Sequence, residues 1–184
     1  MQFLPLNLAG AYQIDPDIFS DSRGSFCRFY DEEKFKAIGH SKKWAQVNHS
    51  YTAKSATVRG MHFQLPPYAE IKMVKCIAGK IFDVIVDVRK DSNTFLQWQG
   101  LELSAENKRS LFIPEGFAHG FQTLTDDCEL IYFHSEPYQP IYESAIRYND
   151  PIINIRWPLP AGFVSERDGQ HPLITNDFTG IKLK

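Results

Sequence analysis

The stretch Lys80-Ile81-Phe82-Asp83-Val84-Ile85-Val86-Asp87-Val88-Arg89 alternates in character from one residue to the next. Its even-numbered positions from 82 to 88 are Phe or Val, whereas the odd-numbered positions mix Ile with Asp. A period of two indicates a β-strand, because successive side chains point to opposite faces. Turn residues separate further short β-rich segments, and the expected strands are Ala45–Tyr51, Thr57–Gln64, Ile71–Ile77, Lys80–Arg89, Gly100–Leu103, Ser110–Pro114, Gly120–Leu124 and Glu129–His134. Many short strands predict an all-β sandwich or barrel.

Little helix is expected around these strands. The segment from Asp31 to Ile38 predicts a short helix that stops at Gly39, and Ser104–Lys108 has helical character as well. Residues 11–30 predict short strands around a turn at 21–24. No linker divides the chain, which we interpret as a single domain, 1–184, whose tail from about Pro158 packs over the barrel as ordered coil with short helical turns.

Composition excludes several classes of partner. The formal net charge of −2 gives no field that would favour nucleic acid or a membrane surface. Cys27, Cys76 and Cys128 form no CxxC pair, and no apolar run approaches the roughly 20 residues of a membrane-spanning helix. The N-terminal residues lack the pattern of a signal peptide. We therefore expect a cytoplasmic protein with reduced thiols.

The strand Val58–Gln64 has an unusual polar face. Alternation places Gly60, His62 and Gln64 together, with space above the glycine, and places Arg59 on the opposite face. A half-buried strand normally turns apolar groups inward, so this polarity suggests a pocket. His62 alone does not distinguish a catalytic from a structural histidine.

Two lysines in the next strand raise a similar question. Lys72 shares a face with Val74 and Cys76, but Lys75 also lies among apolar residues on the other face. Periodicity therefore leaves open which of the two lysines points into the barrel. A buried lysine needs a partner or a functional reason, because desolvating a charge is costly.

A Pro-x-Gly turn stands in Ile113-Pro114-Glu115-Gly116-Phe117-Ala118-His119-Gly120-Phe121, with His119 at the start of the following strand. This pattern resembles the second motif of the cupins, which are double-sheet jelly rolls. Metal-binding cupins carry His-x-His in their first motif, where this chain has His62-Phe63-Gln64. Because Gln is a poor transition-metal ligand, we expect a cupin-like jelly roll with no metal and a pocket in the barrel mouth.

Several segments, taken in order, resemble one family. They are Arg59–Gln64, Gly79–Arg89, Leu103–Asn107, Ile113–Phe121, Asn149–Pro151 and Trp157-Pro158. From about residue 10 to residue 175 the chain resembles the dTDP-4-dehydrorhamnose 3,5-epimerases. The resemblance implies epimerisation at C3 and C5 of a nucleotide-linked 4-keto-6-deoxyhexose in deoxysugar synthesis for cell-surface polysaccharides. The reaction moves protons and not hydride, so no cofactor is expected, and no G-x-G-x-x-G motif is present.

The resemblance also implies roles for individual residues. His62 corresponds to the base, Asp168 to the carboxylate behind it, Lys72 to a cation at the enolate oxygen and Tyr132 to the acid on the opposite face. The positions that correspond to substrate-binding residues are Arg23, Gln46, Asn48, Arg59, His119, Tyr138, Glu143 and Arg167. Because strict alternation turns Arg59 away from His62, either the strand twists or bulges there or Arg59 serves a different site. Family members are homodimers in which the segment of Arg23 reaches the neighbouring site, so a homodimer is expected.

The chain departs from the family pattern at several positions. Arg28 replaces a common Glu, Val47 a common Asp, Glu70-Ile71 a common Gln-Gly, and Phe133 and Arg167 common lysines. These departures leave open the nucleotide, which could be CDP or GDP, and whether one carbon is inverted or two. Two other classes also stay open, namely a non-enzymatic cupin that binds nucleotide sugars and a metal-dependent cupin oxygenase or isomerase.

Overall fold

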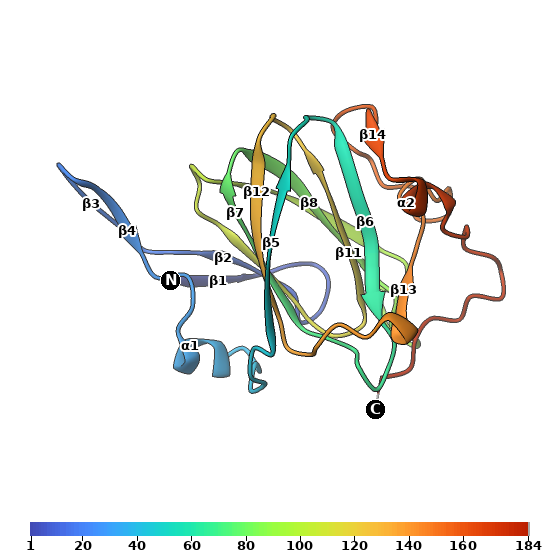
Figure 1. Cartoon of the computed structure of the whole chain (residues 1–184). Coiled ribbons are helices and arrows are strands. Elements are labelled where there is room, and N and C mark those ends of the chain that lie inside the picture. The colour runs from blue at the N-terminus through green and yellow to red at the C-terminus, as the bar shows by residue number, and fades with distance from the viewer. Residues whose placement is uncertain (184) are drawn as a thin grey trace.

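The computed structural model, which describes residues 1–183, has two facing antiparallel sheets (Figure 1). The first sheet has the order β1 (Gln2–Pro5), β2 (Tyr12–Asp15), β10 (Ser110–Ile113), β7 (Lys72–Ala78), β12 (Cys128–His134) and β5 (Gln46–Thr52). The second has the order β13 (Glu143–Ala145), β6 (Thr57–Gln64), β11 (Phe117–Thr123), β8 (Lys80–Asp87) and β9 (Trp98–Ser104), and β14 (Phe163–Val164) pairs with β6 in parallel. The predicted all-β, cupin-like fold with few short helices is confirmed.

Both faces of β8 are buried, which explains its two apolar sets. Ile81 and Ile85 pack between the sheets in the main core. Val84 and Val86 face outward into a second apolar cluster, where residues of the C-terminal segment such as Ile153 and Ile181 cover them. The tail therefore completes the fold, because without it the outer face of β8 would expose a row of valines to water.

A third, largely aromatic cluster lies on the outer face of the first sheet. Met73 of β7 and Phe112 of β10 contact Phe35 there. Phe35 comes from α1 (Glu32–Lys36), which begins after the N-cap residue Asp31, as predicted. Ile71 and Phe133, two departures from the family pattern, also pack in this cluster and not in the barrel.

Several details differ from the sequence predictions. The strand β1 was not expected, and β14 lies in the tail that was expected to be coil with short helical turns. Ser104–Lys108 is a turn and not a helix, because Ser104 Oγ accepts from the Asn107 N–H (3.0 Å) and Asn107 Oδ1 accepts from the Ser104 N–H (3.1 Å). Such side-chain bonds compete with helical ones. The strand expected from Gly120 begins at Phe117, so His119 lies inside β11 and not at its start.

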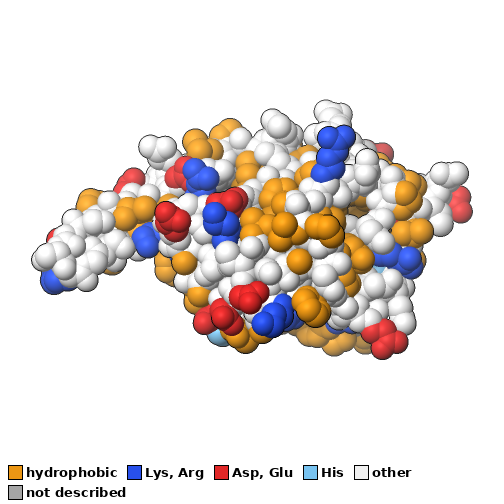
Figure 2. Space-filling view, turned by 90° about the horizontal axis from the view of Figure 1, so that it is seen from above, with side chains coloured by type: hydrophobic (Ala, Val, Ile, Leu, Met, Phe, Trp, Pro, Cys, Tyr) orange, Lys and Arg blue, Asp and Glu red, His pale blue; other side chains and the backbone are white. Residues whose placement is uncertain are grey.

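The hairpin of β3 (Ile18–Asp21) and β4 (Gly24–Cys27) extends from the barrel as an arm (Figures 1 and 2). Phe19 and Phe26 are 66% and 67% exposed on it. The turn predicted at 21–24 forms its tip. Within residues 1–183, the structure contains no helix of the length and hydropathy that a membrane span requires.

Candidate active site

A cavity of about 850 Å³ opens between the two sheets, at the end covered by the C-terminal segment. Its lining residues come from β5, β6, β7, β11, β12 and the segment 163–168. All four predicted catalytic residues line it, namely His62, Lys72, Tyr132 and Asp168. The barrel therefore gathers side chains that are far apart in the sequence.

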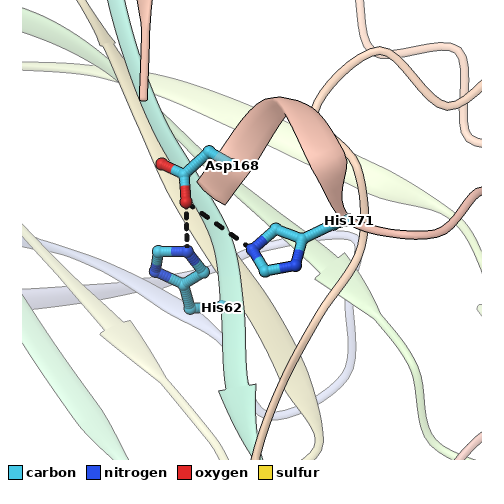
Figure 3. A group of neighbouring side chains, drawn as sticks. All are labelled: His62, Asp168 and His171. Atoms are coloured by element: carbon cyan, nitrogen blue, oxygen red, sulfur yellow. Dashed lines mark hydrogen bonds and ion pairs between the residues drawn. The ribbon is translucent and has the colours of Figure 1, made fainter. Parts of the chain in front are cut away.

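His62 and Asp168 form a hydrogen-bonded pair on the cavity wall (Figure 3). His62 Nε2 lies 2.8 Å from Asp168 Oδ1, and the Gly60 N–H donates to Oδ2 at 3.2 Å. Asp168 belongs to α2 (Glu166–Gln170), which Ser165 caps by accepting from the Asp168 N–H. Burial opposes ionisation of Asp168, but the hydrogen bonds from His62 and Gly60 outweigh it and lower the pKa of the carboxyl. The pair is therefore an imidazole backed by a carboxylate.

A bulge in β6 brings Arg59 to the cavity, which is one of the two alternatives that the sequence left open. His62 pairs with His119, whereas Arg59 pairs with Phe121, so three steps along β6 match two along β11. The extra residue shifts the alternation. Arg59 therefore lines the cavity together with His62, and strict alternation gave the wrong face for it. Its Nε donates to Thr52 Oγ1 at 3.1 Å.

The bulge requires a glycine at position 60. A Cβ on Gly60 would lie 2.5 Å from the Gly120 Cα, in a backbone with φ of +120° that favours glycine. Gly60 lines the cavity, as expected, but the backbone of Gly120 fills the position of its missing Cβ, so the open space does not lie where a side chain would stand. Gln64, by contrast, does not line the cavity: its side chain accepts from the Gln139 N–H at 2.7 Å, and the residue is 3% exposed.

Lys72 is the lysine that points into the barrel. Its Nζ lies 3.1 Å from Glu70 Oε1 and 3.4 Å from the His62 carbonyl oxygen, to which it donates. The Lys72 and Glu70 side chains are only 9% and 8% exposed. A fixed cation thus stands beside the histidine–carboxylate pair in surroundings that screen charge weakly.

Tyr132 faces the cavity from β12, where its hydroxyl lies 3.1 Å from Ser50 Oγ. Burial raises the pKa of Tyr132 above its ordinary value, so the phenol keeps its proton at neutral pH. His119 lies beside it, with 6.2 Å between ring centroids, and its Nε2 is 2.7 Å from Asp83 Oδ1. Sequence patterns did not identify Asp83 or Ser50 as part of the site.

The predicted substrate-binding residues fall into three groups. Asn48, Arg59, His119 and Arg167 line the cavity. Beside the cavity lie Gln46, whose amide donates to Asn48 Oδ1 at 3.0 Å, and Glu143, which pairs with Arg167. Tyr138 contacts both, since its hydroxyl donates to Glu143 Oε2 at 2.6 Å and its N–H donates to Gln46 Oε1 at 3.1 Å. Arg23 is far from this cavity in its own chain, at the arm tip, where it pairs with Asp21 at 2.6 Å.

Two further histidines belong to the site, and no sequence signal singled them out. His134 lines the cavity and contacts Glu70, with 2.8 Å between Nδ1 and Oε2. His171 Nε2 lies 3.6 Å from Asp168 Oδ1. The nitrogen and oxygen atoms of His62, Asp168 and His171 lie within 4.8 Å of one another, so these residues could hold a metal ion, although the His62–Asp168 bond already occupies two of the atoms.

A cupin-like barrel that brings a histidine–carboxylate pair, a lysine and a tyrosine to one cavity defines the class of nucleotide-sugar epimerases with this fold. Comparison with known proteins gives the family. Residues 5–176 match the model of the dTDP-4-dehydrorhamnose 3,5-epimerase family. The chain belongs to this family.

Individual relatives span nearly the whole chain. The dTDP-4-dehydrorhamnose 3,5-epimerase of Shigella flexneri is 45% identical over 156 residues, which cover 84% of this chain and 86% of the relative. The Bacillus anthracis enzyme with TDP and pyrophosphate bound is 39% identical, with a TM-score of 0.91 over 94% of this chain and 99% of the other. A 3'-monoepimerase from Streptomyces bikiniensis in complex with dTDP-quinovose is 34% identical, with a TM-score of 0.86 over 92% and 86%.

Proposed function

We propose that the protein epimerises C3 and C5 of a dTDP-linked 4-keto-6-deoxyhexose, of the dTDP-4-dehydro-6-deoxyglucose type, by proton abstraction and reprotonation. The His62–Asp168 pair, at 2.8 Å on the wall of the cavity, carries this proposal. A protein that only binds a nucleotide sugar does not need a base backed by a carboxylate. Membership of the family supports the substrate class.

The first step is proton abstraction by His62. The C4 ketone makes the neighbouring C3–H and C5–H bonds acidic. Asp168 occupies Nε2 of His62, which leaves Nδ1 to take the proton, and the carboxylate then stabilises the imidazolium. The electron pair of the broken C–H bond moves to the ketone oxygen and forms an enolate. The ammonium group of Lys72 stabilises this developing charge.

The second step is protonation from the opposite face by Tyr132. Its hydroxyl is protonated when the enolate forms, because burial disfavours the phenolate and raises the pKa of Tyr132. The enolate carbon takes the phenolic proton and a new C–H bond forms with inverted configuration. Solvent then restores the proton to Tyr132 and removes the one held by His62. His119, fixed by Asp83 at 2.7 Å, supports the substrate near this tyrosine.

Nucleotide binding involves the remaining predicted residues. Arg59 is an exposed residue on the cavity wall, and a guanidinium suits a diphosphate because its N–H groups donate in parallel. The adjoining wall, against which the nucleotide lies, is formed by Gln46, Asn48, Tyr138, Glu143 and Arg167. Arg23 reaches the site of a partner subunit.

A homodimer accounts for the arm. Its exposed Phe19 and Phe26 form an apolar surface that a second copy of the chain would cover. Sedimentation should show a dimer that the double substitution Phe19→Ser and Phe26→Ser weakens, whereas a monomeric wild-type protein would contradict this.

The chain acts as one domain, since the C-terminal segment supplies Asp168. Its three unpaired cysteines suit the cytoplasm, and no nucleic acid or membrane partner is proposed.

Solvent exchange tests the proposed reaction. With a dTDP-linked 4-keto-6-deoxyglucose in deuterium oxide, we expect deuterium at both C3 and C5. Exchange at C3 alone would place the protein with single-carbon epimerases such as the Streptomyces bikiniensis relative. Binding without exchange would indicate a non-enzymatic cupin. The same assay with CDP- and GDP-linked sugars tests the nucleotide.

Tyr132→Phe separates the two steps. Loss of the acid should reduce inversion by about 10²-fold while proton abstraction, measured as exchange at the substrate carbon, falls much less. Equal loss of exchange and inversion would remove Tyr132 as the acid.

A further inference from the structure

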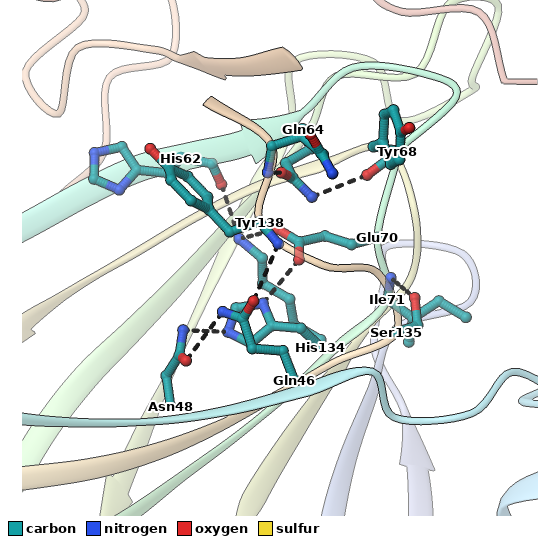
Figure 4. Close-up of polar contacts among 12 residues, drawn as sticks. Gln46, Asn48, His62, Gln64, Tyr68, Glu70, Ile71, His134, Ser135 and Tyr138 are labelled. Carbon is teal, nitrogen blue, oxygen red and sulfur yellow. Dashed lines mark hydrogen bonds and ion pairs between the residues drawn. The ribbon is translucent and has the colours of Figure 1, made fainter. Parts of the chain in front are cut away.

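One continuous row of hydrogen bonds connects the nucleotide side of the cavity to Lys72. Figure 4 labels its members from Tyr138 to Glu70. It passes, in order, through Tyr138, Gln46, Asn48, His134, Glu70 and Lys72. The successive separations between polar atoms are 3.1, 3.0, 3.3, 2.8 and 3.1 Å. One end, Tyr138, lies on the side proposed for the nucleotide, and the other end, Lys72, lies on the side proposed for the ketone of the sugar.

The direction of this row follows from its nucleotide end. The backbone N–H of Tyr138 can only donate, so Gln46 must turn its Oε1 toward it. The Gln46 amide nitrogen then faces Asn48, which must offer Oδ1. The Asn48 amide nitrogen is left to face His134 Nε2. Each orientation is forced by the one before it.

The same logic fixes the ring of His134. Because Asn48 donates to Nε2, this nitrogen must be unprotonated, and the ring proton sits on Nδ1, which faces Glu70 at 2.8 Å. At the other end the ammonium group of Lys72 has donors only. Glu70 must therefore accept on both oxygens, which only the carboxylate can do.

The surroundings of Glu70 keep it ionised. Its side chain is 8% exposed, and this burial by itself raises the pKa. The charge of Lys72 and the hydrogen bond from His134 outweigh burial, so the pKa of Glu70 lies below its ordinary value. A buried carboxylate with donors at both oxygens is a stable end point for the row.

We propose that Glu70 and His134 are positioning residues that hold in one fixed orientation the Lys72 ammonium, the amide of Asn48 on the cavity wall and the amide of Gln46 beside it. The inference rests on the proposed function, which places the ketone at Lys72 and the nucleotide beside the amides. The resemblance described above leads one to expect Gln at position 70, and a glutamine amide cannot accept at both ends as the Glu70 carboxylate does. In this chain the carboxylate of Glu70 therefore fixes which amide atoms of Asn48 and Gln46 face the nucleotide.

Glu70→Gln should disturb both ends of the row. If the new amide turns its oxygen to Lys72, its nitrogen faces Nδ1 of His134, and the ring proton must move to Nε2. Asn48 and Gln46 then have to reverse, and the Tyr138 N–H loses its acceptor. If the amide turns the other way, its NH₂ faces the Lys72 ammonium. Either outcome leaves a donor without a partner.

Nuclear magnetic resonance of histidine labelled with ¹⁵N tests the proposal without substrate. In the full-length wild-type protein at neutral pH we expect the His134 ring to be neutral with its proton on Nδ1, the signal being assigned by its absence in His134→Gln. In Glu70→Gln we expect the amide to turn its oxygen, and not its NH₂, to the Lys72 ammonium, so that the His134 ring proton shifts to Nε2. A wild-type ring protonated on Nε2, or on both nitrogens, would overturn the proposal whatever the reaction catalysed.

Steady-state kinetics supply the second test. His134→Leu breaks the row but keeps the Lys72–Glu70 pair, so we expect KM to rise about 10-fold while kcat changes less than about threefold. His134→Gln, which keeps a donor and an acceptor, should recover most of that loss. Glu70→Gln should both raise KM and lower kcat. An unchanged KM in a folded His134→Leu would overturn the proposal, and absent turnover in the wild type would count against the proposed function alone.

Discussion

Lys72 and Lys75 lie three residues apart on β7, yet they face opposite sides of the sheet. Taken as whole residues, with the backbone included, both are 7% exposed. Lys72 looks into the cavity, with the Glu70 carboxylate at 3.1 Å. Lys75 looks outward, donates to the Lys108 carbonyl oxygen and lies 5.5 Å from the centre of the Phe29 ring. Burial lowers the pKa of Lys75. Burial alone therefore does not mark a functional lysine, whereas a charged partner and a position on the cavity do.

Two histidines repeat the contrast. His62 has Asp168 at 2.8 Å and stands on the cavity wall. His40 lies on the outer side, 2% exposed, stacked on Trp44 at 4.3 Å, and neither of its ring nitrogens has a partner among the described residues. We conclude that changes on the cavity side should reduce activity, whereas changes on the outer side should alter stability.

The largest expected effect is that of His62→Ala. Removing the base should lower kcat/KM on the order of 10³- to 10⁴-fold, the upper part of the range for a positioned general base. Asp168→Asn should cost less, because the imidazole stays and only its charged partner is lost. Both are measured by epimerisation and by solvent exchange, with thermal unfolding as the control for folding. If His62→Ala still exchanged at the wild-type rate, it would not be the base.

The two lysines offer a matched pair. Lys72→Met should lower kcat by about 10²-fold or more, because the enolate loses its cation. Lys75→Met should leave kcat within about twofold and stabilise the fold by about 1 kcal/mol, since replacing a buried charge by an apolar side chain is often favourable. Steady-state rates and urea unfolding of both variants check this. Equal losses of activity would contradict the functional difference between the two faces.

Sequence patterns were most reliable where a period continued through a whole element. The bounds of β6, Thr57–Gln64, match the predicted segment because alternation and flanking turns define them. Periodicity could not find the bulge at Gly60, since an extra residue interrupts the period itself. It also could not choose between Lys72 and Lys75, because both faces of β7 are apolar and buried.

Long-range pairs lay beyond any local pattern. His62 and Asp168 are 106 residues apart, and only resemblance to a family paired them. Glu70 and His134 are 64 residues apart, and their contact depends on the antiparallel register of β7 with β12, in which His134 lies opposite Lys72. Only the departure from the family pattern at Glu70 marked the position as unusual.

The smallest expected effect concerns His40 and stability. Burial lowers the pKa of His40, with the charge of Lys42 acting in the same direction. The unfolded chain therefore binds a proton more readily than the folded one, so the stabilisation is complete above the ordinary histidine pKa of about 6.5 and is lost as the pH falls toward the lower folded value.

His40→Leu keeps an apolar contact for Trp44 and removes this titration. Between about pH 7.5 and about pH 5.5 the urea midpoint of the wild type should fall more than that of His40→Leu, while kcat at about pH 7.5 stays within about twofold. All other titrating groups are common to both proteins, so the difference between the two curves isolates His40. Parallel curves would show that the folded protein accepts a proton on His40 as easily as the unfolded chain does. Burial in the outer aromatic cluster would then not disfavour a charged side chain, and the contrast with the cavity would fail.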